Sequence, residues 1–266
     1  MGSTTATATR PFFIACAEGP STFQEQRVTF TWHKGMSWQV RQRSSIAMAD
    51  TIASLGYDRS RILEVSTKST NHELGVRLSA YNLMLTQRDT GITRPVENWF
   101  QSSKTFTGST ILDQGQQFGP YTELLDREPV EAKRFLNPKL SPKQRSRYEG
   151  DALFERIRAE LKEARFLGFE LNGTAFPAEP KSAFYDFLYT CALLQEKNRA
   201  LANQIASYQV FTDIEFNPWD ARGRIIRYNT QARSCAIVSS LMQRGLIRQA
   251  LSSFSSFVET VGYPDE

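Results

Sequence analysis

The spacing of apolar residues along the chain predicts helices and strands that follow one another without a repeating unit. Apolar side chains recur every three or four positions in three long stretches, which predicts helices at residues 39–55, 184–208 and 231–257. Short apolar runs predict strands at residues 12–15, 28–32, 62–66 and 210–216. Because no regular strand–helix–strand alternation is present, the pattern favours one α+β domain, rich in helices and with a small mixed sheet.

The remaining segments are assigned from their composition. Residues 1–10 are small and polar, which predicts a disordered tail ahead of a domain over residues 11–266. Residues 137–150 hold two prolines and are predicted to form a basic loop inserted into that domain; its basic residues are Lys139, Lys143, Arg145 and Arg147. Residues 151–165 are predicted to form a charged helix, and residues 74–85 are predicted to form an extended or mixed segment. Short helices are expected around residues 121–126 and 130–135.

Composition excludes several classes of protein. A hydrophobic fraction of 40% is typical of a folded chain, and no apolar run approaches the ~18 residues that span a bilayer. Without a signal-peptide pattern, and with three scattered cysteines, the cytoplasm is the expected compartment. Two histidines argue against a His-ligated metal and a Ser-His-Asp triad. The net charge of +4 would tolerate a polyanionic partner but does not demonstrate one.

The stretch from Pro95 to Lys104 carries the strongest candidate chemistry. In a helix, Glu97, Gln101 and Lys104 lie on one face, while Trp99 and other apolar residues line another. A carboxylate, an amide and an amine held together can perform acid–base or amine chemistry. The alternative is the solvated face of an ordinary amphipathic helix, which is the more common case for such a pattern.

A second candidate is the segment from Phe211 to Pro218. Strand alternation would place Asp213, Glu215 and Asn217 on one side, where two carboxylates and an amide could bind a ligand. The simpler interpretation is a strand with one solvated face.

Other polar groups are weaker candidates. Ser79 and Asn82, with Lys68 before them, could hold phosphate or ribose oxygens, although loops are generally polar. The turn at Gly119 and Tyr121 could present N–H groups to an anion, but it is not a phosphate-binding loop of the known glycine-rich type. The basic residues of 137–150 could contact nucleic-acid phosphates, or could simply be solvated.

At these residues the chain resembles the NADAR superfamily of NAD- and ADP-ribose-associated proteins, which includes the YbiA-like N-glycosidases. The marker of that superfamily is a Glu-x-x-Phe-Gln-x-x-Lys helix, matched here by Glu97, Phe100, Gln101 and Lys104. The chain more narrowly resembles the NADAR antitoxins encoded beside DarT-type DNA ADP-ribosyltransferase toxins. The matching segments are residues 74–83, 119–124, 184–189, 211–218 and 229–232.

The resemblance implies a NADAR-like domain that hydrolyses the N-glycosidic bond between ADP-ribose and guanine in DNA. It implies catalytic roles for Glu97, Lys104 and Glu215, with Lys104 acting through a Schiff base or electrostatically. It implies substrate-binding roles for Lys68, Ser79, Asn82, Gln101, Gly119, Tyr121, Asp213, Asn217, Asn229 and Gln231, and Trp99 or Tyr121 could stack on a base. No metal or cofactor is implied beyond ADP-ribose as ligand and product.

The expected partners are ADP-ribosylated DNA and a cognate toxin, with no membrane. Two alternatives stay open from the sequence. One is an N-glycosidase that acts on free ribosylated metabolites. The other is a protein without catalysis that binds ADP-ribose or the toxin itself.

Overall fold

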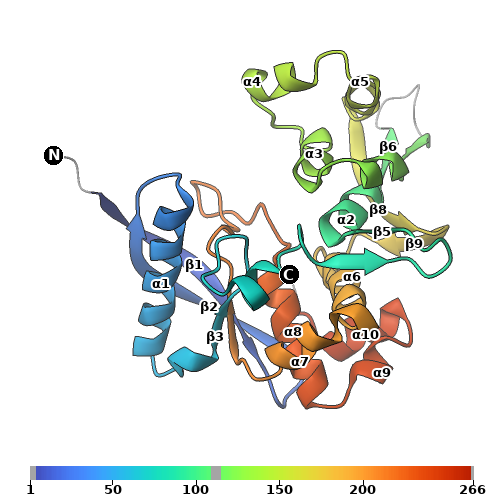
Figure 1. The fold of residues 1–266 in the computed structure, drawn as a ribbon. Helices are drawn as coiled ribbons and strands as arrows, with labels where there is room; N and C mark the ends of the chain where they lie inside the picture. The colour runs from blue at the N-terminus through green and yellow to red at the C-terminus, as the bar shows by residue number, and fades with distance from the viewer. Residues whose placement is uncertain (1–3, 109–114, 265–266) are drawn as a thin grey trace. The chain divides into compact units, whose positions relative to one another are not determined.

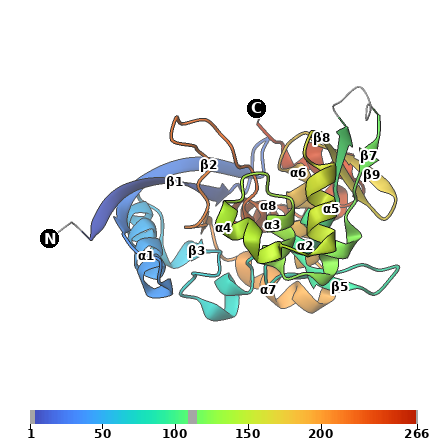
Figure 2. The same cartoon turned by 90° about the horizontal axis from the view of Figure 1, so that it is seen from above.

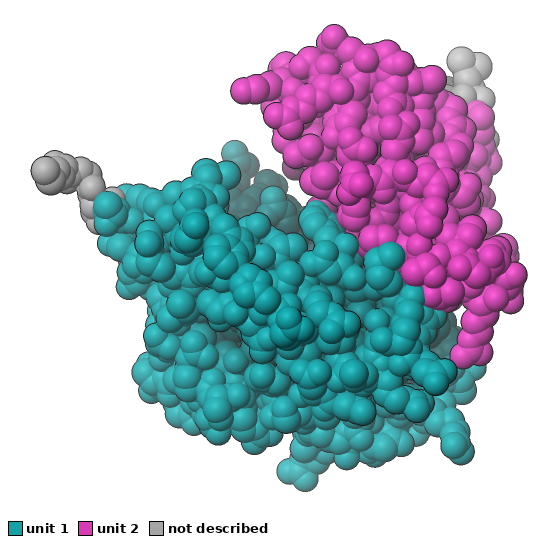
Figure 3. All heavy atoms as spheres, in the orientation of Figure 1, with its two compact units in different colours: residues 1–84, 185–266 teal, residues 85–184 magenta. Residues whose placement is uncertain are grey.

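The computed structural model describes residues 4–108 and 115–264, which divide into two compact units. Unit 1 comprises residues 1–84 and 185–266, and unit 2 comprises residues 85–184 (Figure 3). Helices and small sheets are present in both, which confirms the predicted α+β class (Figure 1). In the described ranges, no helix is long and apolar enough to cross a membrane.

Unit 1 is built on a four-stranded sheet with the order β2-β1-β10-β3. Strands β1 (Thr5–Ala15) and β2 (Phe23–His33) pair in antiparallel register over their whole length. Strand β10 (Val210–Thr212) pairs with β1 in antiparallel fashion and with β3 (Ile62–Glu64) in parallel. Residues far apart in the chain therefore meet at the centre of this sheet.

Helices cover both faces of the sheet in unit 1. Helix α1 (Trp38–Ser54) lies beside β2 on one face of the sheet (Figures 1 and 2). Its Met48 and Ile52 pack against Phe12 and neighbouring apolar residues of the sheet. Helix α8 (Gln231–Gln243) packs against β1 and β10, with Arg233 over the ring of Phe13. Adjacent residues of β1 are thus buried on opposite faces, as expected for a central strand.

The other helical segments of unit 1 are short. They are η1 (Arg59–Arg61), the π-helix η2 (His72–Val76), α6 (Ala183–Leu193, which begins at the end of unit 2), η5 (Glu196–Asn198), α7 (Arg199–Ile205), α9 (Ile247–Ala250) and α10 (Phe254–Val261). A buried ion pair joins α6 to α8, because Arg233 Nε lies 2.9 Å from Asp186 Oδ2. Ser234 and Tyr263 also donate hydrogen bonds to Asp186, so this buried carboxylate is well satisfied.

Unit 2 contains a two-stranded and a four-stranded sheet. Strands β4 (Met84–Thr86, whose first residue belongs to unit 1) and β5 (Thr93–Pro95) form the first sheet. The second sheet has the order β7-β6-β8-β9. Its strands are β6 (Lys104–Gly108), β7 (Gln117–Phe118), β8 (Ala164–Leu171) and β9 (Thr174–Pro177). The helical segments are α2 (Val96–Ser102), η3 (Thr122–Asp126), α3 (Pro129–Phe135), α4 (Pro142–Arg145), η4 (Ser146–Tyr148) and α5 (Ala152–Glu160).

Two predictions about irregular segments are wrong. Residues 5–10 are not a disordered tail, because they extend β1 and pair with residues 28–33 of β2; residues 1–3 lie outside the described residues. Residues 137–150 are not simply a loop. They include α4 and η4, and Leu140 and Tyr148 join a buried cluster with Phe135 and Phe154. In both segments, tertiary burial and pairing outweigh a polar local composition.

The predicted long helices are interrupted. Residues 184–208 form α6, η5 and α7, because the Asn198 side chain donates to the carbonyl of Ala192 and caps the end of α6. Residues 231–257 form α8, α9 and the start of α10. Helix α8 ends where Gly245 adopts φ 66°, a left-handed conformation that glycine takes readily. The charged helix predicted at 151–165 is α5, which stops at Glu160 before β8 begins.

Candidate functional site

Helix α2 carries the first group of predicted site residues and is buried along its whole length. The indole of Trp99 donates to the carbonyl of Leu85 at 3.0 Å. The Asn98 amide donates to the carbonyls of Leu124 and Arg127, at 2.9 and 2.7 Å. These bonds fix α2 from two sides within unit 2. Because Glu97 and Gln101 are only 5% and 4% exposed, the alternative of a solvated helix face is wrong.

Glu97, Gln101 and Lys104 form one hydrogen-bonded chain. The Gln101 amide nitrogen donates to Glu97 Oε1 at 2.8 Å, and Lys104 Nζ donates to Gln101 Oε1 at 2.7 Å. The helix was predicted to include Lys104, but α2 ends at Ser102 and Lys104 is the first residue of β6. The helix-to-strand junction still directs the amine toward the two polar groups. The structure therefore brings this predicted trio together.

Electrostatics in this cluster favour a reactive lysine. Burial lowers the pKa of Lys104 from 10.5 to about 8; Glu97 opposes this shift and Lys133 adds to it. At that pKa, about one lysine in ten is neutral at pH 7, against about one in 2,500 for an ordinary side chain. Lys133, which the sequence did not single out, lies on α3 with Nζ 3.8 Å from Glu97 Oε1. The site thus combines one buried carboxylate with two amines.

Gly119 and Tyr121 support this cluster from the loop after β7. Gly119 has φ 77°, and a Cβ at this position would lie 2.3 Å from the carbonyl oxygen of Lys104. The N–H of Tyr121 donates to the Ser102 carbonyl at 2.7 Å, so it is not available to an anion. Tyr121 and Trp99 are 2% and 3% exposed, and both are core residues. Stacking of either ring on a base is therefore not supported.

Gly119→Ala is expected to destabilise the protein by about 2–4 kcal/mol and to lower any activity that depends on Lys104. The new methyl group would combine a left-handed alanine with a clash against the Lys104 backbone. Gly150→Ala is the matched control, since Gly150 has φ 81° in the same unit but open space around it. Denaturant unfolding measures both variants. Equal losses of stability in the two variants would show that the close contact between residue 119 and the Lys104 carbonyl does not add to the destabilisation.

Unit 1 contains a buried pair of carboxyl groups, Asp213, which was predicted from the sequence, and Glu64, which was not. Glu64, at the end of β3, accepts hydrogen bonds from the hydroxyls of Ser66 and Thr212 at 2.6 Å and from the Ile214 N–H at 2.9 Å. Burial and the nearby charge of Asp213 raise the pKa of Glu64 to about 8. The pair therefore holds a proton near neutral pH. The sequence feature that could have identified Glu64 is its place inside the apolar run Ile62–Ser66.

The segment after β10 is not the strand that was predicted. β10 ends at Thr212, and Asp213 turns back so that its carboxylate accepts from Thr230 Oγ1 at 3.0 Å and from the Glu215 N–H at 3.1 Å. Thr230 is the N-cap of α8. Asp213 is thus buried and ties this segment to α8, whereas Glu215 and Asn217 line a hollow at the surface of unit 1.

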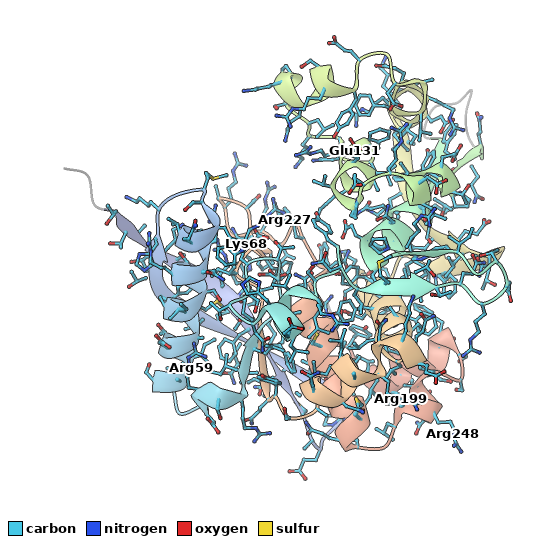
Figure 4. All side chains as sticks on the ribbon, in the orientation of Figure 1. Arg59, Lys68, Glu131, Arg199, Arg227 and Arg248 are labelled. Carbon is cyan, nitrogen blue, oxygen red and sulfur yellow. The ribbon has the colours of Figure 1, made fainter. Side chains whose placement is uncertain are left out.

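The remaining predicted residues all lie in unit 1. The side-chain amide of Gln231 donates to the Val65 carbonyl at 2.9 Å, and that of Asn82 donates to the Val76 carbonyl at 2.9 Å. Among the described residues, Ser79 Oγ and Asn229 Oδ1 are buried and have no hydrogen-bond partner. Lys68, labelled in Figure 4, donates its backbone N–H to Ser66. The binding roles of these residues stay predictions.

The hollow that Glu215 and Asn217 line has a volume of about 470 Å³. Its other walls come from β1, β2, α1 and the segment before α8, and include Arg10, Trp32, Arg41 and Arg227. These residues could not be singled out from the sequence, because they are spread over more than 200 positions and share no motif.

The model of the family described as DarT1-associated NADAR antitoxins matches residues 8–150 and 154–266. The chain therefore belongs to the NADAR antitoxins associated with DarT1, as its resemblance had indicated. No curated protein matches the chain.

Proposed function

We propose that this protein is a DNA ADP-ribosyl-guanine glycohydrolase that acts as the antitoxin of a DNA ADP-ribosyltransferase toxin. The observation that supports it most directly is the buried hydrogen-bonded chain of Glu97, Gln101 and Lys104 in a member of an antitoxin family. A buried carboxylate and an amine of lowered pKa are the groups that cleavage at an anomeric carbon needs.

In the proposed reaction, Glu97 stabilises the positive charge that develops on the sugar as the bond to guanine lengthens. The lone pair of neutral Lys104 Nζ bonds to the anomeric carbon. The bond from that carbon to the guanine nitrogen breaks, and its electron pair stays on the base, which takes up a proton that the new ammonium group releases. The guanine is thereby restored in the DNA.

Water then completes the turnover. The sugar ring opens as the nitrogen lone pair forms a C=N bond, and the ring oxygen takes a proton from solvent, which leaves a protonated Schiff base on Lys104. Addition of water to this carbon and loss of the amine release ADP-ribose and regenerate the lysine. The amide of Gln101, which bonds to both Glu97 and Lys104, keeps the two groups in place during these steps.

The test is to incubate the protein with an oligonucleotide that carries one ADP-ribosylated guanine and to follow the masses of the products. We expect the oligonucleotide to return to its unmodified mass and free ADP-ribose to accumulate. An oligonucleotide that keeps its ADP-ribose would contradict the proposal.

The same assay separates the other two functions. Turnover of a free ribosylated base without turnover of the oligonucleotide would identify an N-glycosidase of small metabolites. If neither substrate is cleaved, but the purified toxin is inhibited in a binding assay, the protein acts by association with its toxin.

A further inference from the structure

The hollow in unit 1 gathers three arginines around one tryptophan. The guanidinium carbons of Arg10 and Arg41 lie 5.1 and 4.6 Å from the ring centroid of Trp32. Arg227 completes the lining from the segment that precedes α8, and Figure 4 labels it there. Stacking on an aromatic ring orients a guanidinium group and leaves its edge N–H donors available.

The three cations lack compensating carboxylates at contact distance. Within the part of the chain that the structure describes, none of the three arginines forms an ion pair. Arg10 Nε is buried and has no hydrogen-bond partner among the residues that the structure describes. Burial lowers the pKa of Arg10, and the charges of Arg41 and Arg227 lower it further, so the three groups repel one another. A bound anion would relieve this repulsion.

We propose that this hollow is a binding site for the diphosphate group of a nucleotide. Three arginines and Glu215 give the lining a net charge of about +2, which balances the two negative charges of a diphosphate diester. The volume of about 470 Å³ is in the range of small-molecule pockets.

The rest of the lining fits the sugar of such a ligand. Glu215 is exposed at the hollow, and its Oε2 accepts a hydrogen bond from Thr67 at 3.5 Å. Its carboxylate and the amide of Asn217 supply acceptors for ribose hydroxyls. A single phosphodiester of the DNA backbone carries one charge and would leave part of this positive charge unbalanced.

This inference concerns binding by unit 1 and does not require that the protein hydrolyse a glycosidic bond. The experiment is isothermal titration of the full-length protein with inorganic pyrophosphate and, separately, with ADP-ribose. Arg41→Gln and Arg227→Gln each remove one charge from the hollow. Arg43→Gln is the matched control, because Arg43 is exposed on the same helix as Arg41 but does not line the hollow. Thermal unfolding verifies that each variant is folded.

We expect Arg41→Gln and Arg227→Gln to weaken the binding of both probes about tenfold or more, and Arg43→Gln to leave it unchanged. Unchanged affinity in both hollow variants, an equal loss in Arg43→Gln, or no binding by the wild type would overturn the proposal. An unmodified single-stranded oligonucleotide is titrated in parallel. If only its binding falls, the hollow holds DNA backbone and the diphosphate assignment is wrong. Glycosidase assays on the same variants are read separately, so failure of hydrolysis leaves the binding result intact.

Discussion

Glu97→Gln is expected to reduce the release of ADP-ribose from modified DNA by about 10²–10⁴-fold, the range for loss of a positioned acid–base or charge-stabilising group. The substitution keeps the size of the side chain and an oxygen that can accept the hydrogen bond from Gln101. It removes only the negative charge that faces the reacting sugar. Single-turnover assays on the modified oligonucleotide measure the effect at the chemical step.

The control for Glu97→Gln is Glu131→Gln. Glu131 lies in the first turn of α3 in the same unit, and Figure 4 labels it. Its replacement should leave the rate within a factor of about two. Because Glu97 opposes the lowering of the pKa of Lys104, the Glu97 variant should also move that pKa below about 8. A variant that retains normal turnover would remove Glu97 from the mechanism while leaving the reaction itself intact.

Borohydride is expected to trap a covalent adduct between wild-type protein and the ADP-ribosyl group, and no adduct in Lys104→Arg. Arginine keeps the positive charge but stays protonated, so it cannot attack the anomeric carbon. Turnover should fall by about 10³-fold or more in this variant if the amine is the nucleophile. Lys133→Met is the control, because it removes the other amine near Glu97 and should keep the adduct. Intact-protein mass spectrometry detects the adduct in the wild type and in both variants.

The pH dependence of the chemical step distinguishes the two roles of Lys104. With a pKa of about 8, the neutral fraction of the amine rises from about a tenth at pH 7 to about nine tenths at pH 9. A nucleophilic lysine therefore predicts a rate that increases roughly tenfold over this interval and then levels off. A lysine that acts through its positive charge predicts a rate that falls as the pH passes 8. An adduct that survives in Lys104→Arg would place the nucleophile elsewhere, with Lys68 as the next residue to replace.

The sequence pattern was sufficient where local spacing determines structure. Helix α1 lies within one residue of its predicted bounds at each end, and the short helices around residues 121–126 and 130–135 are present as η3 and α3. Glu97, Gln101 and Lys104 also lie together as predicted, although the prediction placed all three in one helix. The helix ends two residues before Lys104, but the amine reaches Gln101 from the following strand.

Features that depend on distant residues could not be predicted in this way. Strand β10 stops at Thr212 because Asp213 turns back to Thr230, and no local pattern encodes that partner. The buried carboxyl group of Glu64 is hydrogen-bonded by groups 148 and 150 residues away. The arginines of the hollow come from separate elements, and each one looks like an ordinary surface residue in the sequence.

The order of strands in unit 1 has a consequence for how the protein is made on the ribosome. Strand β10 lies between β1 and β3, yet it is synthesised after all of unit 2. Unit 2 is one uninterrupted segment, so it has its complete sequence while the first half of unit 1 still lacks its central strand. The facing edges of β1 and β3 stay open during that interval, and Glu64 lacks its later partners. Translation therefore imposes an order of folding. The unit that carries Glu97 and Lys104 can form first, and the sheet of unit 1 is completed last.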